Sequence, residues 1–232
     1  MKRRDLLTGS AGLALTMPLA GCDDYGAANM PQPPAAVVGP DGQRRLPWQN
    51  WSGYQSSLPE RRLAPASEDA LARLLADSRG TIRPVGSGHS FTPLVPTDDT
   101  LISLRHFSGL LQHDPQALTA TVGAGSRLGS LGEPLHAAGQ ALINMPDIDA
   151  QTLAGSMATA THGTGAQLGA LHTAAIGLRL VTPTGDILDC SVDSRPELFA
   201  AAQVSLGALG IITQVTLQNV PTTRMRRHVW VE

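Results

Sequence analysis

The chain has 232 residues, a formal net charge of −2 and a single lysine, and only 3% of its residues are aromatic. Nucleic-acid binding needs a basic surface and usually aromatic stacking platforms, so this composition argues against it. The length allows one cored domain beside the N-terminal segments described next.

The first 22 residues have the features of a bacterial export signal. Lys2-Arg3-Arg4 precedes a small apolar stretch at Ala11–Ala20, which is too short for an ordinary membrane span. The paired arginines favour the twin-arginine route, and Leu19-Ala20-Gly21-Cys22 resembles a lipoprotein box in which Cys22 is acylated. We therefore expect an exported lipoprotein that faces the periplasm and is membrane-anchored through Cys22. The alternative is a plain cleaved signal, in which case an unmodified Cys22 could form a disulfide with Cys190.

Residues 23–47 are predicted to be a proline-rich tether. Scattered prolines, glycines and alanines give this stretch no apolar periodicity, which is typical of a semi-extended linker. Trp48 and Trp51 mark the start of folded structure.

Residues 48–117 should form a first subdomain. Ser67 is an N-cap followed by acids in the first turn, which predicts a helix with Leu71 and Leu75 on one face that Gly80 ends. The expected strands are Arg61–Pro65, a short run from Ile82 and Leu101–Leu104.

Residues 118–222 should form a second subdomain. Its expected strands are Thr119–Val122, Ile176–Thr182, Ile187–Cys190 and Ile211–Val220. Its expected helices run from about Leu128 to Gly139, distorted by Pro134, and from Pro196 to Ala202. Without a regular strand–helix–strand rhythm, the pattern indicates an α+β fold rather than a doubly wound sheet.

Two stretches rich in small residues suggest a ligand site. The first, the glycine turn (residues 85–90), reads Val85-Gly86-Ser87-Gly88-His89-Ser90, and its backbone N–H groups could form a concave anion site beside an imidazole. The second, the small-residue segment (residues 155–165), has almost no bulky side chain and could let a flat ligand lie against backbone. Taken alone, each could also be an ordinary surface turn or loop.

Together these stretches resemble the FAD-binding domain of the vanillyl-alcohol-oxidase (PCMH-type) superfamily. Within it the chain is most similar to the sugar-lactone and alditol oxidoreductases, which include gulonolactone, arabinonolactone and galactonolactone oxidases or dehydrogenases. The likeness extends from Gln49-Asn50-Trp51 to Thr213–Leu217 and includes Leu180–Pro183 and Leu206–Ile212. It implies two α+β subdomains with FAD between them.

The resemblance also implies the residues of the site. His89 corresponds to the histidine that commonly bonds covalently to the flavin 8α-methyl group, and His162 is expected to pack under the cofactor or shape its loop. The expected FAD-contacting residues are Val85, Gly86, Ser87, Gly88, His89, Ser90, Gly123, Gly155, Ser156, Thr159, Ala160, Thr161, His162, Gly163, Gly210 and Ile212. No residue is assigned as the catalytic base and none as a metal ligand.

The implied activity is hydride removal from an alcohol carbon of a sugar lactone, alditol or similar polyol, with electrons passed to oxygen or another respiratory acceptor. Residues 223–232 fall where the family's substrate cap domain would begin, so the cap is expected to be missing from this chain. Ala160 stands where many relatives have glycine, which leaves oxidase and dehydrogenase both open. Two alternatives are a truncated flavin-binding lipoprotein without turnover and a tethered solute-binding lipoprotein without flavin.

Overall fold

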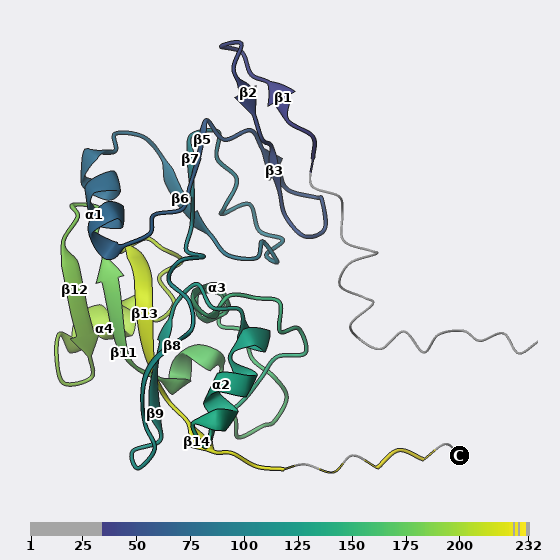
Figure 1. Cartoon of the computed structure of the whole chain (residues 1–232), viewed down its shortest axis with the longest axis vertical. Helices are drawn as coiled ribbons and strands as arrows, with labels where there is room; N and C mark the ends of the chain where they lie inside the picture. The colour runs from purple at the N-terminus through teal and green to yellow at the C-terminus, as the bar shows by residue number, and fades with distance from the viewer. Residues whose placement is uncertain (1–33, 225, 227, 231–232) are drawn as a thin grey trace, which may run out of the picture. The chain divides into compact units, whose positions relative to one another are not determined.

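A computed structural model describes residues 34–224, 226 and 228–230 (Figure 1). The predicted export signal at residues 1–22, with Cys22, and the first part of the predicted tether lie outside the described residues. Within the described part of the chain, no helix has the length and apolar character needed to cross a membrane.

The later part of the predicted tether is not a plain linker. Strands β1 (Val37–Val38) and β2 (Arg44–Arg45) pair antiparallel as a short hairpin. A tight turn joins them, in which the Gly42 N–H donates to the Gly39 carbonyl (3.0 Å), and Asp41 forms an ion pair with Arg45 at 2.7 Å. The proline-rich composition concealed this hairpin, because its turn uses the same residue types as a linker.

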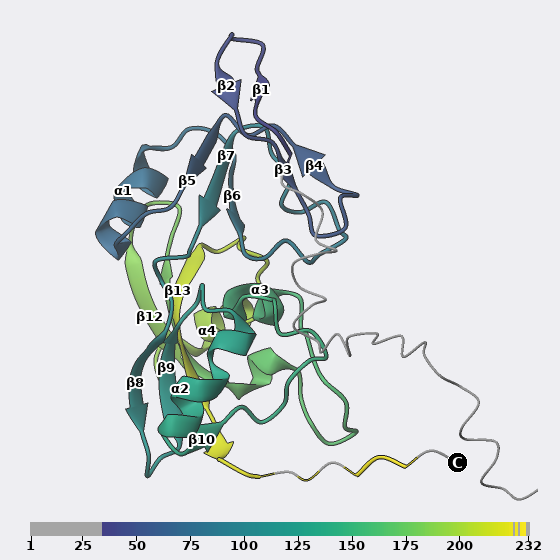
Figure 2. The ribbon, with the colours of Figure 1, turned by 45° about the vertical axis from the view of Figure 1, so that its right-hand side comes forward.

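The first half of the folded part is built on a small parallel sheet. Strands β5 (Arg61–Leu63), β6 (Ile82–Val85) and β7 (Thr100–Ser103) form it in the order β5-β7-β6, and both outer strands run parallel to β7 (Figure 2). A shorter hairpin, β3 (Trp48–Gln49) with β4 (Ser56–Ser57), precedes it. The three predicted strands of this half are therefore present.

Helix α1 (Glu68–Asp77) begins as predicted, since the Ser67 side chain accepts a hydrogen bond from the Ala70 N–H and Glu68 and Asp69 occupy the first turn. It ends earlier than predicted. The chain becomes extended at Ser78, whose N–H donates to the Leu75 carbonyl, so that Gly80 already lies in the loop leading to β6.

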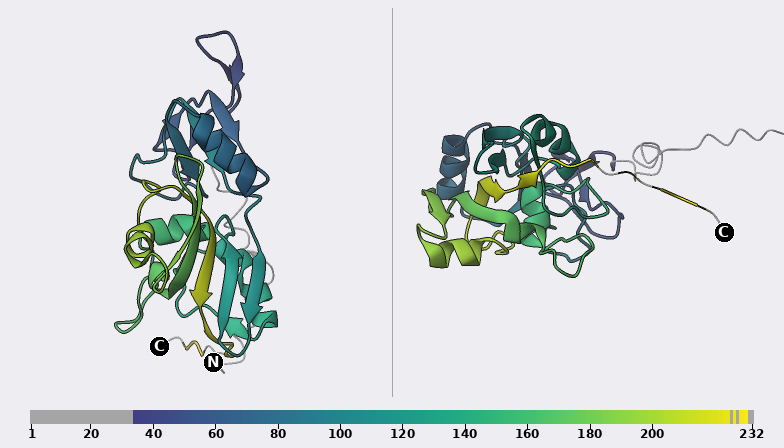
Figure 3. Two further views of the ribbon diagram at one scale, coloured as in Figure 1. Left: turned by 90° about the vertical axis from the view of Figure 1, so that its left-hand side faces the viewer. Right: turned by 90° about the horizontal axis from the view of Figure 1, so that it is seen from below.

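The second half is built on a five-stranded antiparallel sheet. Its strands are β8 (Leu110–Asp114), β9 (Thr119–Gly123), β11 (Ala175–Val181), β12 (Ile187–Ser191) and β13 (Ile211–Gln218), in the order β12-β11-β13-β9-β8 (Figure 3). Strand β8 pairs with β9, so this sheet starts before residue 118, where the sequence placed the boundary. Two minor strands, β10 (Gln140–Ala141) and β14 (Val220–Pro221), pair with each other.

The helix predicted over residues 128–139 is two elements. A 3-10 turn, η1 (Leu128–Ser130), precedes α2 (Gly132–Ala137), and the break falls at Leu131 rather than at Pro134. Pro134 lies in the first turn of α2, where the missing N–H has no intrahelical acceptor to lose. The other helices are α3 (Leu153–Ala158), η2 (Leu171–Ala174) and α4 (Pro196–Ala202).

Two hydrophobic clusters hold these layers together. The larger lies between the five-stranded sheet and α2, α3 and α4, with Val122, Leu135, Met157, Phe199 and Val215 among its buried members. The smaller joins Leu71 and Leu75 of α1 and Ile102 of β7 to Val181 and Ile211, which lie at the ends of β11 and β13. The fold is therefore α+β with two sheet-based halves, as predicted, and the two halves share core residues.

Candidate functional site

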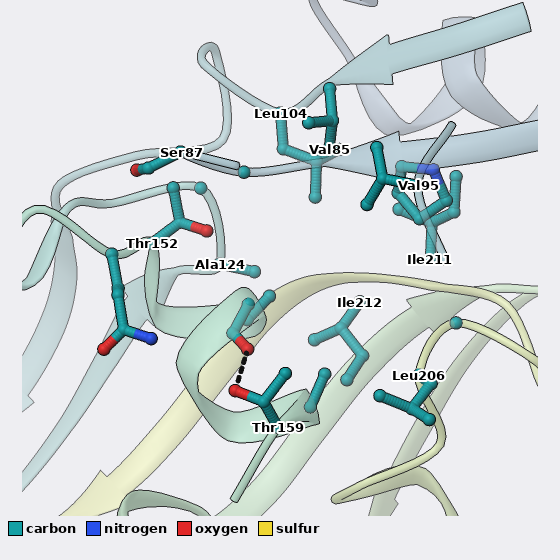
Figure 4. Close-up of a pocket in the computed structure, with 18 of the residues that line it drawn as sticks. Val85, Ser87, Val95, Leu104, Ala124, Thr152, Thr159, Leu206, Ile211 and Ile212 are labelled. Atoms are coloured by element: carbon teal, nitrogen blue, oxygen red, sulfur yellow. Dashed lines mark hydrogen bonds between the residues drawn. The ribbon is translucent and has the colours of Figure 1, made fainter. Parts of the chain in front are cut away.

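A pocket of about 410 Å³ lies between the two halves of the fold. One wall comes from β6, the glycine turn and the end of β7; the other comes from α3, the loop after β9 and the loop before β13 (Figure 4). This volume is within the range usual for ligand pockets. Figure 4 shows Ser87 and Thr152 toward one end and the apolar side chains of Val95, Leu206 and Ile211 toward the other.

Every residue of the glycine turn lines this pocket. Gly88 has φ +70°, a left-handed conformation that glycine adopts at no steric cost. A Cβ at Gly86 would collide with the Thr152 hydroxyl, and the Ser87 hydroxyl donates to the Ala150 carbonyl, so the turn lies directly against the chain that leads into α3. Among the described residues, the N–H groups of Gly88, His89 and Ser90 donate no hydrogen bond and are free for a ligand.

The small-residue segment contributes less than the sequence predicts. Gly155 and Thr159 line the pocket, and the Thr159 hydroxyl donates to the Gly155 carbonyl at 3.1 Å (Figure 4). Ser156 is fully buried on the core side of α3, where its hydroxyl donates to the Leu153 carbonyl. Thr161 faces Gln151, whose amide donates to its hydroxyl at 3.1 Å. One turn of helix thus separates pocket-facing from core-facing residues of similar composition.

Of the predicted site residues, the structure brings ten to the pocket: Val85, Gly86, Ser87, Gly88, His89, Ser90, Gly155, Thr159, Gly210 and Ile212. It does not bring six of them there: Gly123, Ser156, Ala160, Thr161, His162 and Gly163. Gly123 packs against the Phe107 backbone, and Gly163 against the Met145 carbonyl. His162 is exposed, with Nδ1 2.9 Å from the Gly163 carbonyl oxygen.

The charged residues of the pocket are all of one sign. Arg83, Arg105 and Arg127 line it, and no aspartate or glutamate does among the described residues. Within the described ranges no ion pair involves these three arginines, although Arg105 Nε lies 3.2 Å from His106 Nε2. Guanidinium groups without carboxylate partners favour an anionic ligand, and phosphate oxygens suit their fork geometry.

His89 is half-buried, and its ring is stacked on that of Trp51 with the centroids 5.5 Å apart and an interplanar angle of 21°. Burial, and secondarily the positive charge of Arg127, lowers the pKa of His89 below its ordinary value. The imidazole is therefore neutral over a wider range of pH than a free histidine. A neutral imidazole can act as a nucleophile or as a hydrogen-bond partner.

Sequence reasoning missed the pocket's cations and much of its apolar wall. The missed residues are Arg83, Pro84, Leu94, Val95, Ser103, Leu104, Arg105, Ala124, Gly125, Arg127, Gln151, Thr152, Ala154, Ala158, Ala202, Ser205, Leu206, Gly207 and Ile211. One signal was available. Arg83 and Arg105 lie within or just after neighbouring parallel strands, and ligand sites commonly form at the carboxyl ends of such strands. In the described part of the chain, no cluster of histidine, cysteine or acidic residues could hold a metal ion.

A family model described as "FAD binding domain" matches residues 59–191, more than half of the chain. The chain therefore belongs to this family of FAD-binding domains. The predicted resemblance, the two-part α+β fold and the assignment of FAD as the cofactor all agree with this membership. The pocket fits the group as well, because it combines a backbone cradle at the glycine turn with three arginines.

Relatives in the same family are much longer. L-gulono-1,4-lactone dehydrogenase of Mycobacterium tuberculosis is 42% identical over 184 residues, which are 78% of this chain and 42% of that protein. D-arabinono-1,4-lactone oxidase of Eremothecium gossypii is 37% identical over 77% of this chain and 35% of that protein. A solved structure of alkyldihydroxyacetonephosphate synthase superimposes with a TM-score of 0.63 at 26% identity, over 71% of this chain and 32% of that one. The chain thus spans less than half the length of these relatives.

Proposed function

We propose that this chain is the FAD-binding part of an oxidoreductase that oxidises an alcohol carbon of a sugar lactone, alditol or similar polyol. The observation that carries the proposal is the single-sign pocket between the two halves, with the glycine turn on one wall and α3 on the other. The two relatives above are named as a lactone dehydrogenase and a lactone oxidase, which supports lactones as the substrate class.

Different residues of the pocket would contact different parts of the cofactor. The arginines would attract its pyrophosphate, and the free N–H groups of the glycine turn would cradle an anionic or carbonyl oxygen. The apolar side chains of Leu104, Ile211 and Ile212 would exclude water from the flat ring system. Bound flavin supplies the hydride acceptor, and electrons would then pass to oxygen or to another acceptor.

His89 is proposed as the covalent attachment point. An imidazole nitrogen would form a bond to the 8α carbon of the flavin, while one C–H bond at that carbon and the imidazole N–H bond break. The two protons and two electrons released would reduce the ring system, and dioxygen would take them up afterwards to give hydrogen peroxide. The lowered pKa of His89 supports this role, since the reacting imidazole must be neutral.

The setting of the enzyme is also a proposal. The sequence favours export by the twin-arginine route and acylation at Cys22, which would anchor the folded part on the periplasmic side of a membrane. Covalent attachment would suit this location, because no free FAD pool exists there to replace lost cofactor.

The test is denaturation of the purified full chain followed by separation of protein from small molecules. Flavin fluorescence should remain with the polypeptide of the wild type and should leave it completely in His89→Ala. Flavin that stays with the polypeptide in His89→Ala would refute the attachment site. A colourless native protein would refute FAD binding, and a yellow protein that no lactone or alditol bleaches would favour a flavin-binding chain without turnover.

A further inference from the structure

A corner of the chain at residues 50–55, which we call the aromatic corner, holds the second half of the glycine turn in place. The Trp51 N–H donates to the Gly88 carbonyl (2.9 Å), the Asn50 side-chain amide donates to the Ser90 carbonyl (3.0 Å), and the Gln55 amide donates to the Phe91 carbonyl (3.2 Å). Three carbonyls within four residues are thus satisfied by one short segment. The backbone on both sides of His89 is fixed by this segment.

The aromatic corner is itself well ordered by its own contacts. Asn50 is only 2% exposed, and its side-chain oxygen accepts hydrogen bonds from the Gln55 N–H (3.0 Å) and from the Ser52 hydroxyl (3.3 Å). The Trp48 ring lies against Gly88, 3.4 Å from where a Cβ would stand. The corner therefore acts as a preformed support and not as a loop that adapts to the turn.

The ring of Trp51 contacts two other rings instead of packing into the hydrophobic core. It is 42% exposed and contributes little to the core, yet it stacks on the His89 imidazole with the ring centroids 5.5 Å apart. It also forms a T-shaped pair with the Phe91 ring, with centroids 6.1 Å apart and an interplanar angle of 88°. His89 makes no hydrogen bond to any described residue. The stack with Trp51 is thus the contact that sets the plane of the imidazole.

We propose that Trp51 is a positioning residue: by stacking on the imidazole of His89, it holds that ring at the pocket wall in the orientation needed for bonding to the flavin. This inference rests on the proposed covalent attachment at His89. The aromatic corner precedes residue 59, where the family match begins, so the match itself assigns it no role. Bond formation depends steeply on the alignment of the reacting atoms, and misplacement by about 1 Å can cost roughly a hundredfold in rate.

The experiment compares Trp51→Leu, which keeps apolar bulk without a flat face, with Trp51→Phe, which keeps a stacking ring. Tyr54→Leu is the matched control, because Tyr54 lies in the same corner but is 81% exposed, and among the described residues its ring stacks on no other ring. Apoprotein of each full-length variant is mixed with saturating FAD, and the rate at which flavin becomes resistant to denaturation is measured. Noncovalent affinity is measured in parallel in a His89→Gln background.

We expect Trp51→Leu to attach flavin roughly 10- to 100-fold more slowly than the wild type, with noncovalent affinity and melting temperature nearly unchanged. Trp51→Phe should stay within about threefold of the wild-type rate, because it retains ring stacking. A second readout needs no cofactor. In NMR spectra of the apoprotein, the His89 ring protons should show an upfield ring-current shift caused by Trp51. This shift should be lost in Trp51→Leu and retained in Tyr54→Leu. The His89→Gln variant identifies these signals.

Equal attachment rates in the wild type and Trp51→Leu would overturn the inference while leaving the proposed function intact. Equal slowing in Trp51→Leu and Trp51→Phe would also overturn it, because stacking would then not be the property that matters. If the wild type itself attaches no flavin, the proposed function fails at His89 and the positioning role fails with it. That case is recognised because attachment is then missing from Tyr54→Leu as well.

Discussion

The glycine turn and the small-residue segment are alike in composition but differ in how the fold uses them. All six residues of the turn line the pocket, whereas the segment contributes only a few and gives Ser156 and Met157 to the core. The turn leaves the edge of a three-stranded sheet and has no core of its own to complete. The segment begins inside α3, and a helix that packs on a sheet must bury one of its faces. A run of small side chains therefore indicates that something lies close to the backbone, but it does not show whether that is a ligand or the protein core.

The largest effect should come from the buried side of α3. Met157 is fully buried in the larger cluster, so Met157→Ala should lower the free energy of unfolding by about 2–5 kcal/mol. Thr159→Ala, at the pocket-lining residue that caps the C-terminus of the same helix, should change it by less than about 1 kcal/mol. Urea denaturation followed by circular dichroism measures both. Comparable losses in the two variants would contradict the division of α3 into a core face and a pocket face.

A smaller effect is expected where the turn meets the chain leading into α3. In Gly86→Ala, the new methyl group would collide with the Thr152 hydroxyl, at a cost of about 1–3 kcal/mol, and the pocket wall must shift. FAD affinity should therefore fall by roughly tenfold or more. Adding Thr152→Ala should restore part of the loss, which a double-mutant cycle of binding titrations would reveal.

His162→Ala is the control for this second prediction. The His162 side chain is exposed and lies outside the pocket, so its removal should leave FAD affinity unchanged within about 0.5 kcal/mol. A loss as large as that of Gly86→Ala would show that the small-residue segment contacts the cofactor after all.

The smallest effect concerns pH. Burial and Arg127 lower the pKa of His89, so flavin attachment should persist below the ordinary histidine pKa of about 6.5 and decline only at more acidic pH. In Arg127→Gln the imidazolium loses a repulsive neighbour and the pKa of His89 rises, which moves the acidic limb of the rate profile toward higher pH. Attachment rates from pH 4 to 8 at saturating FAD would show this shift. Movement in the opposite direction would contradict the electrostatic role of Arg127.

Much of the fold was predictable because its signals are local. The Ser67 cap, the alternating burial of β13 and the turn at Pro183–Asp186 are each specified by residues close in sequence. The errors fell at strands whose residues are mostly exposed, which have no apolar pattern of their own and form only by pairing with a partner strand. Strand β8 forms because it pairs with β9. Strands β1 and β2 have the composition of a linker, and only their pairing with each other makes them a hairpin.

The site was less predictable for the same reason. The glycine turn can be recognised from its sequence. Arg83, Arg105 and Arg127 are far apart in the chain and come to one pocket only when the two halves pack together. Gly123 was chosen where Ala124 and Gly125 line the pocket instead, because Gly123 ends β9 packed against the Phe107 backbone and the loop that reaches the pocket begins only after it. A single sequence does not specify which side faces the ligand.

The shared core of the two halves has a consequence for how ligand reaches the pocket. Val181 and Ile211 extend from the large sheet into the cluster beneath α1, and Glu68 at the start of α1 accepts a hydrogen bond from the Thr213 hydroxyl of β13 at 2.5 Å. These contacts join the two halves of the fold through a shared core. A hinge motion that separates the two halves would disrupt this packed core, so we expect FAD to enter the pocket without such an opening. For the same reason, we expect neither half to fold when it is expressed alone.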